Sequence, residues 1–273
     1  MGQRRTHHAL AVVTGAGSGI GRAFSVELGR RGGRVVCADK DPLTAKQTAV
    51  LVEEVGGSAT VAECDVAVED EVRSLALTAE AWLGRPPSLV VNNAGIGAGG
   101  RPIGEAPLED WKRTLDVNLW GVIHGCHVFV PALREAGLGG IINVASAAGF
   151  AAAPRMAAYN VSKAGVLSLS ETLAAELSGS GVAVTVLCPT GVKTNIVANA
   201  EHIDPSVEGA AHLLMRFGTS PERVARMTLD AHDKGRLYVV PQPDAQLIWR
   251  TKRLAPTPYT RLAGLVGRFA PNE

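Results

Sequence analysis

Short apolar runs alternate with longer segments of helical spacing along most of the chain. Apolar runs of five to seven residues are typical of strands buried on both faces of a parallel sheet. The pattern predicts strands at 9–14, 34–38, 58–64, 88–92, 140–145, 182–188 and 236–240. It predicts helices at 42–55, 69–82, 108–136 and 157–177, with another beginning near Ile20.

Seven strands joined by helical crossovers predict an α/β fold of the Rossmann type. We expect a doubly wound, seven-stranded parallel sheet flanked by helices on both faces. The chain has 273 residues, which is enough for one domain of this kind with a substantial core.

The pattern changes after Pro241, where the chain becomes basic and aromatic. Leu262, Leu265, Val266 and Phe269 follow the spacing of an apolar helix stripe. Such a basic amphipathic end could cover a neighbouring subunit or close a site, which we favour, or lie on an anionic membrane surface.

Composition excludes several classes of function. The 27 basic and 26 acidic residues nearly cancel, so no overall field favours nucleic acid. The four cysteines form no C-x-x-C pair and the seven histidines show no metal-ligand spacing, so we expect neither a metal nor a disulfide framework. The apolar run at 9–13 is too short for a signal-peptide core, which predicts a cytoplasmic protein.

The stretch VVTGAGSGIGRAF at 12–24 lies between a predicted strand and a predicted helix, where a phosphate-binding turn belongs. Gly15 suits the tight turn out of the strand, and Gly19 lets the backbone approach a pyrophosphate. Gly21 lets the helix pack closely on the sheet. A purely structural turn is the alternative interpretation.

Asp39 closes the second predicted strand, 18 residues after Gly21. An acidic side chain there can accept hydrogen bonds from the adenosine ribose and would repel a 2′-phosphate. NAD is therefore favoured over NADP, although Lys40 could partly attract that phosphate. An exposed, merely solubilising Asp39 is the alternative.

Tyr159 and Lys163 are four residues apart in a predicted helix and share one face. For tyrosine to act as a base at neutral pH its pKa must fall by about three units. One ammonium about 4 Å away at an effective dielectric constant of about 20 supplies enough energy for that shift. An ordinary exposed pair is the alternative.

Together these pieces resemble the short-chain dehydrogenase/reductase family, in its NAD(P)-dependent oxidoreductase subgroup. The matching pieces are TGAGSGIG from Thr14, Asp39, Cys64-Asp65-Val66, the NNAG sequence from Asn92, Asn118, Ser146 with Tyr159 and Lys163, and PTGVKT from Pro189.

The resemblance implies four catalytic roles. Tyr159 would be the acid/base, and Lys163 would lower its pKa and bind the nicotinamide ribose. Ser146 would hydrogen-bond the substrate oxygen. Asn118 would hold a water that links Lys163 to solvent.

The resemblance also implies the cofactor contacts. Asp65 and Val66 would lie at the adenine, and Val192 and Thr194 would hold the nicotinamide carboxamide. The expected cofactor-binding residues are Gly15, Ser18, Gly19, Ile20, Gly21, Asp39, Asp65, Val66, Asn92, Ala94, Gly95, Tyr159, Lys163, Pro189, Val192 and Thr194.

We therefore expect one catalytic domain over 1–243, with a substrate lid at about 195–218 and the tail at 244–273. The expected function is NAD-dependent oxidation of a secondary alcohol, or reduction of the ketone, on an apolar substrate. An NADPH-dependent carbonyl or 3-oxoacyl reductase and a catalytically silent dinucleotide-binding sensor or scaffold are the alternatives. Family habit favours a homodimer or homotetramer.

Overall fold

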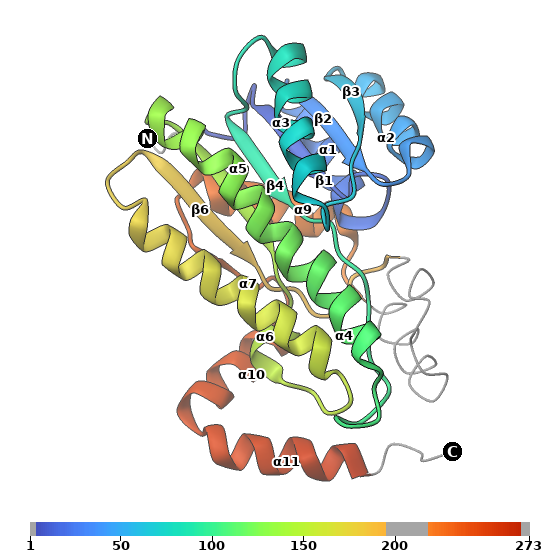
Figure 1. The fold of residues 1–273 in the computed structure, drawn as a ribbon. Helices are drawn as coiled ribbons and strands as arrows, with labels where there is room; N and C mark the ends of the chain where they lie inside the picture. Colours follow the sequence, from blue (N-terminus) through green and yellow to red (C-terminus); the bar gives the residue numbers. More distant parts are fainter. Residues whose placement is uncertain (1–3, 195–217, 269–273) are drawn as a thin grey trace.

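A seven-stranded parallel sheet forms the centre of the computed structural model, which describes residues 4–194 and 218–268 (Figure 1). Its strand order is β3-β2-β1-β4-β5-β6-β7. The order reverses between β1 and β4, and ligands of such sheets bind beyond the carboxyl ends of the strands at that point. The strands are β1 (Leu10–Thr14), β2 (Arg34–Asp39), β3 (Ser58–Glu63), β4 (Leu89–Asn92), β5 (Gly139–Val144), β6 (Val182–Leu187) and β7 (Tyr238–Val239).

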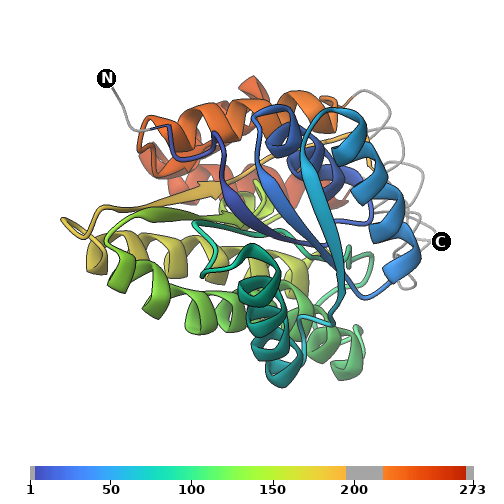
Figure 2. The same cartoon turned by 90° about the horizontal axis from the view of Figure 1, so that it is seen from above.

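Helices cover both faces of this sheet. Helices α1, α2 and α9 lie on one face of the sheet, and helices α3, α5 and α7 lie on the other face (Figure 2). The helices are α1 (Gly19–Arg30), α2 (Pro42–Glu54), α3 (Glu69–Leu83), α4 (Leu108–Leu115), the π-helical turn η1 (Asp116–Trp120), α5 (Gly121–Ala136), α6 (Ala148–Ala151), α7 (Ala157–Glu176), α9 (Pro221–Asp233), α10 (Pro243–Leu254) and α11 (Pro256–Arg268).

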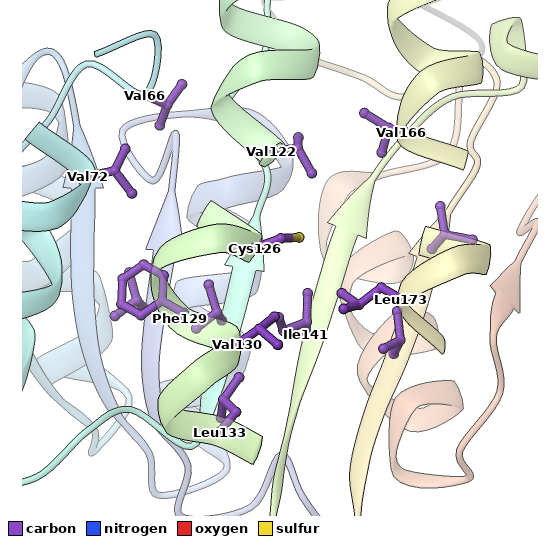
Figure 3. Packing of buried hydrophobic residues seen from close by; sticks show 14 of the residues in the cluster. Val66, Val72, Val122, Cys126, Phe129, Val130, Leu133, Ile141, Val166 and Leu173 are labelled. Carbon is purple, nitrogen blue, oxygen red and sulfur yellow. The ribbon is translucent and has the colours of Figure 1, made fainter. Parts of the chain in front are cut away.

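Alternate residues of each strand enter two different cores. In β1, Val12 belongs to one apolar cluster, whereas its neighbours Ala11 and Val13 belong to the other. Figure 3 shows the first cluster, in which Phe129 of α5 and Leu173 of α7 flank Ile141 of β5. Burial on both faces explains why the strands are continuously apolar in sequence.

The predicted fold class is confirmed, and six of the seven strands agree with the prediction to within one residue at each end. The last strand is shorter than predicted. The helical segment predicted over 108–136 is confirmed at both ends, but it contains the π turn η1 between α4 and α5, which was not predicted. A π turn inserts one residue into a helix, and apolar periodicity is nearly insensitive to that.

The C-terminal segment packs on the domain. Ala245 of α10 is fully buried in the same cluster as the central strands. The domain boundary at 243 stays a prediction. The predicted lid, apart from Gly218, and the stripe residue Phe269 lie outside the described residues. In the described part of the chain, no helix is both long and apolar enough to cross a membrane.

Candidate active site

The glycine-rich turn leads directly from β1 into α1. Gly15 and Gly19 adopt left-handed backbone angles, with φ of 63° and 53°, which side chains other than glycine rarely tolerate. A Cβ on Gly21 would lie 2.0 Å from the Gly15 carbonyl oxygen, so α1 can begin only with glycine at that position. Free backbone N–H groups at the start of a helix favour a bound phosphate.

Asp39 at the end of β2 is held firmly beside this turn. Its Oδ2 accepts a hydrogen bond from Gly17 N at 2.8 Å, and its Oδ1 accepts one from Asp41 N at 3.0 Å. A carboxylate has about four acceptor sites, so two such bonds leave capacity for hydroxyl donors. Lys40 also lines the cleft.

Ser146 and Tyr159 line the cleft together. Ser146 follows β5, and Tyr159 lies in the first turn of α7. Ser146 Oγ also accepts a hydrogen bond from Ala148 N at 3.2 Å and donates to Pro189 O at 3.4 Å. The serine hydroxyl is therefore positioned by α6 and by the loop after β6.

Lys163 lies one turn after Tyr159, as its spacing predicts, but it is buried. Its Nζ donates a hydrogen bond to Val144 O at 3.0 Å and lies 5.8 Å from the centre of the Tyr159 ring. Burial lowers the pKa of this ammonium to about 8, an effect that the neighbouring Cys188 opposes. The ammonium therefore loses its proton at a pH well below that of an ordinary lysine but still holds most of it at neutral pH.

Burial raises the pKa of the Tyr159 phenol above its ordinary value, and only the hydrogen bond with Ser146 opposes that increase. The net direction is opposite to the lowering expected from Lys163. The physical reason is that the Tyr159 hydroxyl loses hydration, whereas Lys163 directs a proton to Val144 O. The role of Lys163 in lowering this pKa stays a prediction.

Asn118 lies in the π turn behind the cleft and is fully buried. Its Oδ1 accepts a hydrogen bond from Ile96 N at 2.8 Å, and its Nδ2 donates to Ile96 O at 2.9 Å. A Cβ on Gly95 would lie 3.1 Å from Asn118 Oδ1 and 3.4 Å from Lys163 Nζ. The absence of a side chain at Gly95 therefore leaves both polar groups close to one point.

The residues predicted for the adenine follow β3. Asp65 and Val66 line the cleft beside Cys64. Asp65 Oδ1 accepts a hydrogen bond from Ala67 N at 2.9 Å, which fixes the turn that follows β3.

The remaining expected residues divide into two groups. Pro189, Val192 and Thr194 line the cleft, and Val192 forms an isolated parallel bridge with Thr219. Asn92 does not line it, because its Nδ2 donates to Asn143 Oδ1 at 2.9 Å across the β4–β5 pair. Gly21 and Asn118 likewise lie behind the lining residues.

The structure brings most of the predicted residues into one cleft at the carboxyl ends of the strands. The apolar lining residues Val117 and Val144 were not predicted. Val117 directly precedes Asn118 and Val144 ends the strand before Ser146, so adjacency to a motif could have indicated both. In the described residues, no cluster of acidic, histidine and cysteine side chains could hold a metal.

The cleft fits a dinucleotide in its chemistry. The glycine turn and the start of α1 offer backbone N–H donors to a pyrophosphate, and Asp39 offers acceptors to a ribose. Val192 and Thr194 line the same cleft, and Thr194 lies beside the glycine turn, because a Cβ on Gly19 would be 3.1 Å from Thr194 Cγ2. Fold and cleft together define a dinucleotide-binding α/β protein.

Comparison with known proteins identifies the family. The short chain dehydrogenase family model matches residues 9–204, and the chain belongs to the short-chain dehydrogenase/reductase family. A solved family member from Burkholderia phymatum, in complex with NAD, is 32% identical with a TM-score of 0.85, covering 92% of this chain and 94% of its own. The sequence-based assignment to this family is confirmed.

Two curated relatives are also similar. "Probable oxidoreductase EphD" of Mycobacterium tuberculosis is 37% identical over 257 residues, which is 90% of this chain but 43% of that protein. This chain therefore spans less than half the length of that relative. The 1-deoxy-11-beta-hydroxypentalenate dehydrogenase of Streptomyces exfoliatus is 35% identical over 259 residues, 90% of each chain.

Proposed function

We propose that this protein is an NAD-dependent oxidoreductase that interconverts a secondary alcohol and its ketone. The observation that carries the proposal is the shared cleft. Asp39 ends β2 and the glycine turn follows β1, Ser146 follows β5 on the other side of the point where the strand order reverses, and Tyr159 and Lys163 line the same cleft. Membership of the family and the NAD complex of a solved relative support the same conclusion.

In this proposal the cofactor, when bound, accepts or returns the hydride, and the protein handles the proton. During oxidation the Tyr159 oxygen removes the hydroxyl proton of the alcohol, and during reduction it gives that proton to the carbonyl oxygen. The Ser146 hydroxyl donates a hydrogen bond to the same substrate oxygen and stabilises its developing charge. Lys163, when charged, favours the ionised form of Tyr159.

Asp39 supports the preference for NAD. Its carboxylate is fixed by Gly17 N and Asp41 N, so it cannot easily rotate away from a ligand. Ribose hydroxyl groups can donate to it, whereas a 2′-phosphate at the same place would meet a like charge. NAD is therefore the proposed cofactor.

An alcohol on an apolar framework is the proposed substrate class. Ile96, Val117 and Val144 give the cleft apolar walls beside Tyr159. The Streptomyces exfoliatus relative is named as a dehydrogenase of a hydroxypentalenate, which supports an alcohol as the reacting group.

We also propose that the protein is a homodimer or homotetramer and that it is located in the cytoplasm. The four cysteines at Cys37, Cys64, Cys126 and Cys188 are buried as free thiols, which suits a reducing compartment.

Lys40 supports the second candidate, an NADPH-dependent carbonyl or 3-oxoacyl reductase. It lines the cleft next to Asp39 and could pair with a 2′-phosphate. In that case the attraction between Lys40 and the 2′-phosphate would have to exceed the repulsion between Asp39 and that phosphate.

Calorimetric titration with NAD, NADH, NADP and NADPH tests the proposal without a known substrate. We expect NAD and NADH to bind more tightly than the phosphorylated pair. Tighter binding of NADPH would favour the reductase, and no binding of any of the four would contradict both candidates. Binding without turnover of any secondary alcohol or ketone would favour a silent sensor or scaffold.

A further inference from the structure

The short helix α6 contacts both Ser146 and α7, the helix that carries Tyr159 and Lys163. Its first backbone N–H, that of Ala148, donates to Ser146 Oγ. Its second residue, Gly149, touches the backbone of α7, because a Cβ there would lie 2.7 Å from Lys163 O. A shift of α6 would therefore change the position of Ser146 relative to Tyr159 and Lys163.

The backbone conformation of the loop after α6 depends on contacts with other segments. Ala152 and Arg155 have left-handed backbone angles, with φ of 53° and 61°, without being glycine. Such angles persist only where surrounding contacts impose them. Two contacts come from nearby parts of the catalytic region: Asn160 Nδ2 donates to Ala153 O at 2.7 Å, and Gly100 N donates to Arg155 O at 2.8 Å.

A further contact comes from the C-terminal segment. Tyr259 Oη of α11 donates a hydrogen bond to Ala151 O at 2.9 Å, across 108 residues of sequence. Ala151 is the last residue of α6, and carbonyl groups at the end of a helix have no partner within it. α11 therefore supplies a donor that α6 itself lacks.

Aromatic packing places α10 against the same helix. The ring of Trp249 lies 6.3 Å from that of Phe150 in α6 and 5.2 Å from that of Tyr238 in β7. Tyr238 Oη donates in turn to Glu171 Oε1 of α7 at 2.7 Å. Figure 1 shows α10 and α11 together at the end of the molecule where α6 lies.

We infer that Tyr259 is a positioning residue, which holds α6 through Ala151 O and so fixes the position of the Ser146 hydroxyl relative to Tyr159. It touches neither cofactor nor substrate in this role. The C-terminal helices thus belong to the working active site, although none of the family motifs lies in them. For its kinetic readout this inference rests on the proposed dehydrogenase function.

The test compares Tyr259→Phe with Thr260→Val in the full chain. The first variant removes only the hydroxyl that reaches Ala151 O. The second removes a neighbouring hydroxyl, which bonds Pro256 O within α11 and does not reach α6. Each substitution removes one hydroxyl from α11 and can weaken that helix. A difference between the two variants therefore reports the contact with α6.

Two measurements are made on each variant. The first is turnover of cyclohexanol, as a probe alcohol, with NAD. We expect Tyr259→Phe to lower kcat about fivefold, in line with the loss of one hydrogen bond, and to leave the KM for NAD unchanged. Thr260→Val should leave both parameters unchanged.

The second measurement does not depend on turnover. The chain has three tyrosines, so isotope labelling at Cζ gives three NMR resonances, of which that of Tyr159 is identified by its loss in Tyr159→Phe. The Tyr159 resonance should move in Tyr259→Phe and stay in Thr260→Val. An unmoved resonance, or an unchanged kcat in an enzyme that turns over the probe, overturns the inference. Failure of the wild type to bind any nicotinamide cofactor would instead overturn the proposed function, and the resonance would still decide this inference.

Discussion

Asn118 and the backbone of Ile96 form a reciprocal pair of hydrogen bonds, at 2.8 Å from Ile96 N and 2.9 Å to Ile96 O. The π turn η1 directs the amide toward the segment that follows the NNAG sequence. One side chain thereby ties the α4–α5 helical region to the loop beside the cleft. π turns are often found at functional sites, and this one orients a residue directly behind Lys163.

Asn118→Ala should destabilise the protein and reduce its activity. The substitution leaves the N–H and carbonyl of Ile96 without their partners in a partly buried place, which costs up to about 1–3 kcal/mol for each unsatisfied group. Urea denaturation measures the loss of stability, and kcat is measured where the variant is fully folded. Thr228→Val, which removes a buried hydroxyl that bonds Val224 O in α9, is the control. Equal kcat in the two variants would confine Asn118 to a structural role.

Tyr159→Phe should retain the cofactor and lose turnover. The ring stays in place, but no group remains to exchange a proton with the substrate, and general acid–base catalysis contributes about 100-fold or more. Calorimetry should show an affinity for NAD near that of the wild type. Near-normal kcat in this variant would refute the proposed role of Tyr159.

Lys163→Met should stabilise the folded protein at neutral pH while reducing its activity. Burial lowers the pKa of this ammonium from 10.5 to about 8. Below pH 8 both folded and unfolded chains hold the proton, and the folded state bears the full cost of the buried charge, about 3 kcal/mol. Loss of the hydrogen bond to Val144 O reduces the gain from substitution.

The same residue gives a pH dependence. Between pH 8 and 10.5 the unfolded chain binds a proton that the folded chain lacks, so the Lys163 contribution to stability rises with pH. The difference in unfolding free energy between wild type and Lys163→Met should therefore shrink across that window. A difference that stays constant from pH 7 to 10.5 would contradict the lowered pKa.

Asp39→Asn should weaken the discrimination against NADP. Removing the charge relieves repulsion of a 2′-phosphate, and we expect the ratio of NADP to NAD affinity to rise roughly tenfold. Asp65→Asn is the matched control, because it removes a carboxylate at the adenine end of the same cleft. It should affect both cofactors alike. If the ratio of NADP to NAD affinity changed equally in the two variants, Asp39 would not be the residue that selects NAD over NADP.

The local sequence pattern was sufficient to predict the sheet and many of the residues that line the cleft. Continuous apolar runs mark strands that are buried on both faces, as Val12 and Val13 show by entering opposite cores. The glycine turn and the Tyr159–Lys163 spacing are also local, because turn geometry and helix periodicity depend on neighbouring residues. Predictions about these features needed no knowledge of what packs against them.

The environment of each side chain could not be predicted from local sequence. Burial sets the direction of the Tyr159 and Lys163 pKa shifts, and burial depends on elements far away in sequence. The π turn at Asn118 and the contact of Tyr259 with Ala151 are likewise settled by long-range packing. The order of residues along the chain is enough to identify the chemical groups that the protein carries and the strands and helices that bear them. Which of those groups lose water, and which partners they contact, follows from long-range packing, because desolvation and hydrogen bonding depend on distance in space.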